Sequence, residues 1–228
     1  MLFKYLPPSR IDVIENRNLR FSSPKALNDP YEERFKLGNS EWEVGGLASK
    51  DELMKFVSLS RNPLNLLMWS HYTDSHQGYV VGFHRTDSYF IGAETVRYRH
   101  LRSNFNGLLL TPDKLKSFNV KDALKKIVLE KAIDWSYEEE ERLFLQDVPQ
   151  SITEVGVDIW GEPILLNEFP AKSVACVYLG VSSSPELKEE IICILKQYNH
   201  EVPLYQLRMS KTMFALEASR VSYTQQTV

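Results

Sequence analysis

Residues 134–144 read DWSYEEEERLF, with four consecutive glutamates between two aromatic residues and an apolar pair. Glutamate favours helices, so one interpretation is a helix with a solvated charged surface. The aromatic and apolar residues fit a β-strand equally well. Side chains alternate along a strand, so Glu138, Glu140 and Arg142 would then share one face. Which interpretation holds decides both the local fold and the chemistry.

A strand would place two carboxylates and a guanidinium in one compact row. Inside a cleft, repulsion between Glu138 and Glu140 would raise the proton affinity of one carboxylate, and Arg142 would oppose that effect. Such a row suits general base catalysis or the holding of a sugar hydroxyl. The alternative is a solvated edge strand or helix face in which Arg142 is an ordinary ion-pair partner.

The composition is that of an ordinary globular protein. The 228 residues are 43% hydrophobic and 25% charged, and the length predicts a single domain over residues 1–228. The formal net charge of −3 gives no global basic field and therefore no indication of a nucleic-acid partner. A local basic groove can still be hidden in a neutral average.

The sequence predicts a cytoplasmic protein that does not enter the membrane. Cys176 and Cys193 both lie in apolar runs, which predicts two buried thiols in a reducing compartment. The first residues lack the basic and apolar pattern of a secretion signal. No apolar stretch approaches the roughly 18 residues that span a bilayer.

Hydrophobic periodicity predicts many short strands and a few helices. Helices are expected at 9–17, 63–72, 111–135 and 184–198, with Pro63 at the first helical position of the second and Ser184 capping the fourth. Strands are expected at 2–6, 19–23, 55–61, 78–83, 93–99, 175–180, 202–209 and 213–218. Strands outnumber those of a βαβ series, so the predicted class is α+β with a mostly antiparallel sheet.

The stretch LRFSSPKALNDPYE, residues 19–32, gathers polar groups at the end of a predicted strand. Ser22 and Ser23 offer hydroxyl groups to a ligand or a helix cap. Asn28 and Asp29 order a tight turn without any ligand.

A second dense stretch, LLMWSHYTDSHQGYVVGF at residues 66–83, holds Trp69, His71 and Tyr72. An aromatic and histidine cluster can stack a flat heterocycle and contact a phosphate. The alternatives are core packing for Trp69 and a buried, hydrogen-bonded His71. His71 and His76 are five residues apart, which is poor spacing for a shared metal, so no metal site is predicted. Neither a glycine-rich phosphate loop nor a Gly-x-Ser-x-Gly elbow is present.

Four stretches together resemble a bacterial family catalogued as domain of unknown function 2971. They are LFKYLP, LRFSSPKALNDPYE, SLSRNPLNLLMWSHYTDSHQGYVVGF and KAIDWSYEEEERLF, in this order. The resemblance covers residues 1–147, and residues 148–228 are expected to add a strand, a helix and a strand to the same domain. Where the family has a tryptophan before the arginine, this chain has Glu141, which predicts a more exposed sheet edge.

The order of the motifs in that family is similar to that of the ADP-ribosyltransferase-like fold, a bent, split, mostly antiparallel sheet with flanking helices that binds NAD. The resemblance implies that Tyr5 lies in the first motif, Ser22 and Ser23 in the second, and Glu138-x-Glu140 in the third. It also implies a toxin or phage-defence effector that uses NAD as substrate and modifies nucleic acid or protein.

The implied chemistry assigns a role to each candidate residue. Cleavage of the nicotinamide–ribose bond creates an oxocarbenium-like centre, which Glu140 would stabilise while Glu138 orients the acceptor. Tyr5, Trp69 or Tyr72 would stack the nicotinamide. His71 and Arg142 would contact the diphosphate or position the glutamates, with Asn28, Ser22 and Ser23 completing the NAD site.

Two other classes of function remain open from the sequence. A metal-dependent nuclease would use Glu138, Glu140 and Asp29 as ligands, with Lys131 or Lys4 near the phosphate. A non-catalytic module would use the same motifs for packing and turns and would bind a partner. The sequence does not predict the oligomeric state.

Overall fold

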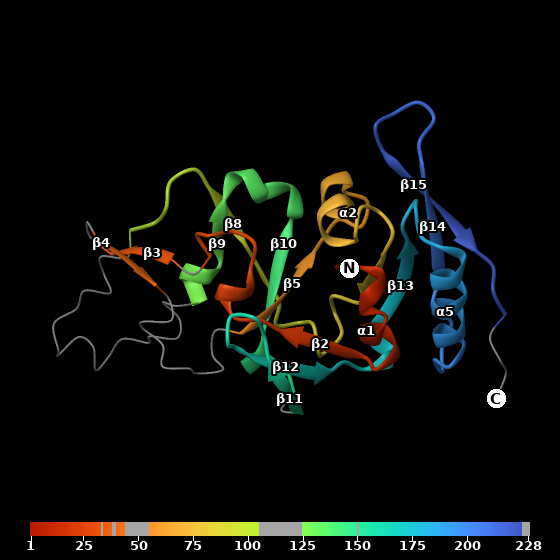
Figure 1. Cartoon of the computed structure of the whole chain (residues 1–228), viewed down its shortest axis with the longest axis horizontal. Helices are drawn as coiled ribbons and strands as arrows, with labels where there is room; N and C mark the ends of the chain where they lie inside the picture. Colours follow the sequence, from red (N-terminus) through yellow and green to blue (C-terminus); the bar gives the residue numbers. More distant parts are fainter. Residues whose placement is uncertain (33, 38–39, 44–54, 105–124, 150, 225–228) are drawn as a thin grey trace.

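The computed structural model describes residues 1–32, 34–37, 40–43, 55–104, 125–149 and 151–224. Within these residues the strands form one large sheet and three small ones, and few helices accompany them (Figure 1).

The large sheet is open and mostly antiparallel, as the sequence predicts. In the described chain it has eight strands in the order β15-β14-β13-β6-β1-β5-β10-β7. All neighbours are antiparallel except β13 and β14, which are parallel. The strands are β1 (Leu2–Leu6), β5 (Phe56–Ser60), β6 (Tyr79–Phe83), β7 (Glu94–Thr95), β10 (Glu140–Phe144), β13 (Val174–Leu179), β14 (Leu204–Met209) and β15 (Leu216–Val221).

Three smaller sheets lie beside the large one. One joins β11 (Ile152–Val157), β12 (Pro163–Glu168) and β2 (Asn18–Phe21), and a bridge between Ser22 and Phe56 ties its end to β5. The others pair β3 (Arg34–Leu37) with β4 (Ser40–Glu43), and β8 (Arg97–Arg99) with β9 (Glu130–Ala132) in parallel. Figure 1 shows β3, β8 and β9 on the opposite side of β10 from α2 and α5.

Three α-helices lie within the segments for which the sequence predicts helices, and each is shorter than predicted. They are α1 (Asp12–Glu15), α2 (Leu66–Tyr72) and α5 (Pro185–Lys196). Ser184 caps α5 as expected, because its side chain accepts from the Leu187 amide. The prediction of Pro63 as the first helical residue is wrong. The helix begins after Asn65, whose side chain accepts from the amides of Leu67 and Met68 and so caps it.

The predicted long helix over 111–135 is only partly testable, because 111–124 lie outside the described residues. Helical structure covers 125–128, but the chain then enters β9 and a 3-10 turn, η6 (Ile133–Glu138). The helix prediction is therefore wrong from residue 130 onward, because pairing of β9 with β8 overrides local helix propensity. The remaining 3-10 turns are η1 (Pro8–Arg10), η2 (Pro24–Ala26), η7 (Leu145–Asp147) and η8 (Ala171–Ser173).

Alternation along β1 divides the core between the two faces of the sheet. Leu2 and Leu6 pack in a cluster with buried residues of α1 and α5. Phe3 and Tyr5 belong to a second cluster, which also contains Trp69 of α2. The sheet is therefore apolar on both faces near β1, so a polar group there needs a specific partner.

The large sheet separates locally between β1 and β5, and we call this place the split. The described residues show one register pair between the two strands, Phe3 with Ser60. By contrast, β1 pairs with β6 at five positions, and β5 pairs with β10 at five. Lys4 spans the split, since its Nζ donates to the carbonyl oxygen of Ser58 at 3.1 Å. The split is where a ligand can reach the middle of the sheet.

The two cysteines differ in exposure, so the expectation of two buried thiols is wrong for one of them. Cys176 is buried, whereas Cys193 is exposed. Cys193 lies two positions after the buried Ile191 on α5, which turns its side chain to the polar face of the helix. No helix in the described part of the chain is long and apolar enough to cross a membrane.

Candidate functional site

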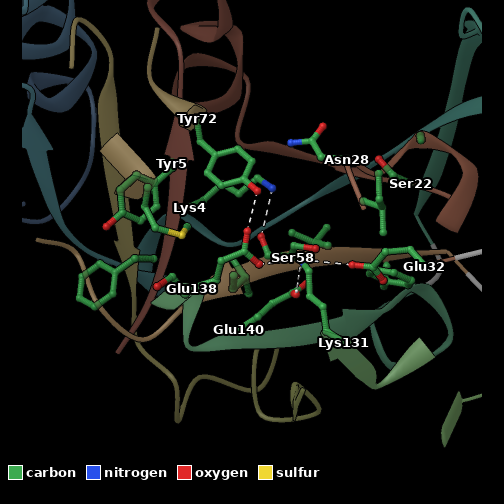
Figure 2. A pocket seen from close by; sticks show the side chains of 18 of the residues that line it. Lys4, Tyr5, Ser22, Asn28, Glu32, Ser58, Tyr72, Lys131, Glu138 and Glu140 are labelled. Atoms are coloured by element: carbon green, nitrogen blue, oxygen red, sulfur yellow. Dashed lines mark hydrogen bonds and ion pairs between the residues drawn. The ribbon is translucent and has the colours of Figure 1, made fainter. Parts of the chain in front are cut away.

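A pocket of about 270 Å³ opens in the split. Its walls come from β1, β5, α2, β9 and the start of β10, together with the turn that follows β2 (Figure 2). Its polar and charged lining is Lys4, Tyr5, Arg20, Ser22, Asn28, Glu32, Ser58, Ser60, Tyr72, Lys131, Glu138 and Glu140.

The glutamate run turns its carboxylates into the protein. Residues Glu140–Phe144 form β10, and all five are buried, so the solvated-surface interpretation is wrong. Glu140 and Arg142 share a face, as the strand prediction requires. Glu138 is not on the strand, however, but ends η6. Glu139 joins the two segments in a left-handed conformation with φ 45°, and both flanking carboxylates still reach the same pocket.

Three carboxylates and two cations form a buried group that we call the carboxylate cluster: Glu32, Glu138, Glu140, Lys131 and Arg142. The Lys131 Nζ lies 2.6 Å from Glu138 Oε2 and 3.2 Å from both Glu140 Oε2 and Glu32 Oε1. Arg142 Nη2 contacts Glu32 Oε1 at 2.6 Å, and its Nε contacts Glu140 Oε1 at 2.7 Å. With all five groups ionised, the cluster carries one excess negative charge.

Arg142 is held from several sides at once. It is fully buried, it donates to the Val128 carbonyl oxygen, and its guanidinium lies 4.4 Å from the centre of the Phe56 ring. A buried cation with this many partners is a fixed counter-charge. It positions Glu140 from behind and does not itself line the pocket.

Glu140 remains ionised at neutral pH. Burial alone would raise the pKa of its carboxyl, but the nearby Arg142 and Lys131 and hydrogen bonds from Arg142 and Ser58 outweigh burial and lower the pKa to about 2. A carboxylate with so low a pKa is a poor general base at pH 7. It is a permanent negative charge suited to stabilising a positive centre.

Lys131 is the matching cation. Burial disfavours its charged form, yet Glu140, Glu32 and Glu138 raise the pKa of its ammonium well above the usual value. The ammonium also lies 5.0 Å from the centre of the Trp135 ring. The sequence predicts Lys131 near a phosphate only in the nuclease alternative, and its position among the carboxylates was not predicted.

Two tyrosines face the split from different elements. Tyr72 of α2 donates its hydroxyl to Glu138 Oε1 at 2.6 Å, and burial together with Glu138 raises the pKa of that hydroxyl, so it remains a donor. Tyr5 donates to the Asn62 carbonyl oxygen at 2.7 Å and packs edge-on against Trp69. The structure thus brings the predicted Tyr5, Tyr72, Glu138 and Glu140 to one pocket.

Lys4 adds an amine to the pocket. Burial lowers its pKa to about 8, although Glu140 and Glu138 oppose this effect, so part of the amine is neutral near that pH. The signal in the sequence was a lysine in the middle of the apolar strand LFKYL.

Glu32 was also missed. It is buried, and within the described residues its Oε2 has no hydrogen-bond partner. Its sequence context, a turn that ends in two glutamates, gives no sign that it reaches β10.

The other predicted site residues lie in different places. Ser22 and Asn28 line the pocket, whereas Ser23 does not, and its buried Oγ has no partner among the described residues. Trp69 is fully buried and donates Nε1 to the Pro63 carbonyl oxygen at 2.7 Å, which confirms the core-packing interpretation. His71 is exposed outside the pocket, so the interpretation as a buried histidine is wrong.

Glu141 does not sit at an exposed sheet edge, contrary to expectation. Its side chain is 8% exposed and its Oε2 accepts from Arg85 Nε at 2.8 Å. The short strand β7 covers this edge of β10 by pairing Thr95 with Glu141. An ion pair thus occupies the place where the resembled family has an aromatic ring.

A metal centre finds no support in this geometry. In the part of the chain that the structure describes, no group of three or more His, Cys, Asp or Glu residues is arranged to hold a metal ion. The glutamates of the carboxylate cluster instead surround the Lys131 ammonium. Asp29, the third ligand of the nuclease alternative, lines a neighbouring pocket.

Comparison with known proteins gives one match. A family model described as "Protein of unknown function (DUF2971)" matches residues 68–143. This segment contains Tyr72, Lys131, Glu138 and Glu140, and the match supports the resemblance noted from the sequence. No curated protein and no solved structure matches the chain significantly.

Proposed function

We propose that the pocket in the split binds the nicotinamide riboside end of NAD, and that the protein is an ADP-ribosyltransferase-like enzyme that cleaves the glycosidic bond to nicotinamide. The observation that carries the proposal is the ionised Glu140, held by Arg142 and Lys131 at the wall of a pocket that opens within the sheet.

The charge of the pocket fits the transition state. Departure of nicotinamide leaves positive charge on C1′ and the ring oxygen of the ribose. A carboxylate already fixed in place stabilises that charge without reorganisation at the moment of reaction. The carboxylate cluster carries one excess negative charge, which the Lys4 ammonium beside it offsets while it is protonated, so the ionised Glu140 is the group that would face the oxocarbenium-like centre.

Hydrogen-bonding capacity also favours a sugar. Glu32 Oε2 lacks a partner among the described residues, and a buried polar atom in that state gains from a ligand donor. Asn28, Ser58 and Ser60 add amide and hydroxyl groups to the wall. The volume of the pocket is about 270 Å³, just below the usual range of ligand sites of about 300–1,000 Å³. A pocket of this volume suits half of a dinucleotide.

The proposed reaction balances with the groups present. The bond between C1′ and the nicotinamide nitrogen breaks, and its electron pair leaves with neutral nicotinamide. A hydroxyl or amine of the acceptor attacks C1′, and its proton passes to solvent or to the neutral fraction of Lys4. Tyr72 holds Glu138 so that this second carboxylate orients the acceptor. As the family resemblance implies, the acceptor is nucleic acid or protein and the role is that of a toxin or phage-defence effector.

The test is release of nicotinamide from NAD, measured chromatographically. Glu140→Gln keeps the shape of the side chain and removes its charge, so we expect at least about a hundredfold loss of turnover, the scale of one lost electrostatic contact. Glu139→Gln is the matched control, because Glu139 is the neighbour of Glu140 on the chain, accepts from Asn62 Nδ2 and does not line the pocket. Full turnover in Glu140→Gln, or no release by the wild type, would refute the proposal.

A further inference from the structure

A second pocket of about 420 Å³ adjoins the first, and its lining is mainly cationic, whereas lysines and arginines equal the carboxylates in the lining of the first. Lys131 lines both pockets. The second, which we call the basic pocket, is formed by β3, β8, β9 and the segment that follows β8. Its cationic lining is Arg34, Lys36, Arg99, Arg102 and Lys131, together with His100.

The local charge balance reverses that of the chain. Among the described residues, five lysines and arginines line the basic pocket against three acidic residues, Asp29, Glu130 and Asp134. The whole chain has 27 lysines and arginines against 30 acidic residues. Concentrating positive charge in one hollow of a slightly acidic protein creates a field that attracts an anion.

The cations of the basic pocket differ in the ion pairs that they form with other described residues. Arg99 pairs with Glu130 at 2.9 Å, and Arg102 pairs with Glu41 at 2.5 Å. Arg34 and Lys36 lie two positions apart on β3, which places them on one face, and both are exposed. Neither forms an ion pair with another described residue. The register of β3 with β4 sets Arg34 opposite Glu43 and Lys36 opposite Glu41, and both cations remain exposed to a phosphate group.

An aromatic ring lies within the same basic surface. Tyr31 lines the basic pocket and is 56% exposed, and the guanidinium of Arg102 lies 5.2 Å from the centre of its ring. Single-stranded nucleic acids bind where cations follow the backbone and aromatic rings stack the bases. A protein acceptor has no general need for this combination.

We infer that the basic pocket binds single-stranded nucleic acid through its phosphodiesters and presents it as the acceptor to the adjoining pocket. This assignment rests on the proposed function for the acceptor role, but its binding part does not need NAD. Arg34, Lys36 and Arg102 contact phosphates, and Tyr31 stacks a base.

The experiment measures binding of short fluorescein-labelled single-stranded RNA and DNA to the full chain by anisotropy. The test variant is Arg34→Glu with Lys36→Glu. The control is Lys172→Glu with Lys211→Glu, which reverses two exposed charges away from the basic pocket and changes the net charge equally. We expect affinity about tenfold lower in the test variant. The slope of log affinity against log salt should fall by roughly 0.7 for each lost phosphate contact.

A second variant tests the pocket without changing its charge. Tyr31→Leu should weaken binding by about tenfold through lost base stacking, while the salt slope stays unchanged. Circular dichroism confirms that each variant is folded. Comparison of the RNA and DNA arms identifies which nucleic acid is preferred.

The outcomes separate the two proposals. Nicotinamide release without oligonucleotide binding, or equal weakening in the control, would overturn the basic pocket as the acceptor site and leave the proposed reaction standing. Oligonucleotide binding that depends on Arg34, Lys36 and Tyr31 supports the site even when NAD turnover fails. Radiolabel from NAD transferred to protein in place of the oligonucleotide would overturn the acceptor assignment.

Discussion

A glutamate is buried on each face of β10, but the two glutamates differ in the cations that pair with them. On the pocket face, Glu140 belongs to a cluster with more carboxylates than cations. On the opposite face, Glu141 forms a one-to-one pair with Arg85, whose side chain is 34% exposed. Arg85 also donates to the carbonyl oxygens of Phe90, Ile91 and Ala93.

The difference separates a structural ion pair from a candidate site. The Arg85 pair is neutral, reaches solvent and ties a loop to the strand, so it needs no ligand. The carboxylate cluster is enclosed, and Lys4, with a pKa of about 8, offsets its excess charge only while it is protonated. Buried charges are costly even when they are paired. A protein that keeps so many charged groups buried at a pocket wall has a reason beyond stability, and ligand binding is the reason we favour.

The largest effect is expected when the arginine on each face of β10 is replaced. Arg142→Met leaves Glu32 and Glu140 buried without their guanidinium, which should lower the free energy of unfolding by about 3–5 kcal/mol. Arg85→Met should lower it by about 1–3 kcal/mol, because water can reach the freed Glu141. Urea denaturation of both variants gives the two values. Equal losses would show that the two faces are not energetically distinct.

The pH dependence of stability provides a sharper probe of the pocket face. The pKa of Glu140 is lowered to about 2 from its ordinary value of 4.5. Its ionised form therefore stabilises the fold above pH 4.5, and this contribution, on the order of 3 kcal/mol, is lost as pH falls from 4.5 toward 2.

Glu140→Gln should flatten that part of the curve of stability against pH. Urea midpoints at a series of acid pH values give the measurement, and Glu139→Gln serves as control. A wild-type curve that Glu140→Gln leaves unchanged between pH 4.5 and 2 would mean that the carboxylate is not held as described.

A smaller effect than that of Arg142→Met is expected for the hydroxyl that reaches the cluster from α2. Tyr72→Phe removes the donor that lies 2.6 Å from Glu138, which should cost about 1.5–3 kcal/mol, as expected for a hydrogen bond to a charged group. Tyr137→Phe is the control, because its hydroxyl donates to no other described residue. Thermal unfolding compares the two. A loss in the control as large as in Tyr72→Phe would assign the effect to ring packing.

Local patterns in the sequence predicted most strands of the large sheet and the face of β10 on which Glu140 lies. Alternation placed Glu140 and Arg142 on one face, and turn residues marked the ends of β1 and the start of α5. The start of α2 is decided by a local cap from Asn65, whereas the errors at β9 and Glu141 depend on distant partners. Glu130–Ala132 forms a strand because β8 pairs with it, and Glu141 is buried because β7 and Arg85 cover it.

The sequence predicted some of the residues of the site and not others. Tyr5, Tyr72, Glu138 and Glu140 carry aromatic or acidic signals in conspicuous motifs, and the structure brings them together. Glu32 and Lys131 lie in unremarkable contexts and join the site only through contacts across the fold. The contact between Arg142 and Glu32 joins residues 110 positions apart, a separation at which local propensity and periodicity carry no information.

The sequence alone determined a mixed α and β chain with a mostly antiparallel sheet and an acidic strand whose alternate residues share a face, because hydrophobic periodicity is a local property. The tertiary structure decided that β1 and β5 separate, that three carboxylates gather around one lysine, and that a basic pocket adjoins them. These features depend on which strands pair and how far they diverge. Such pairing is settled by the packing of the whole core and not by any single segment.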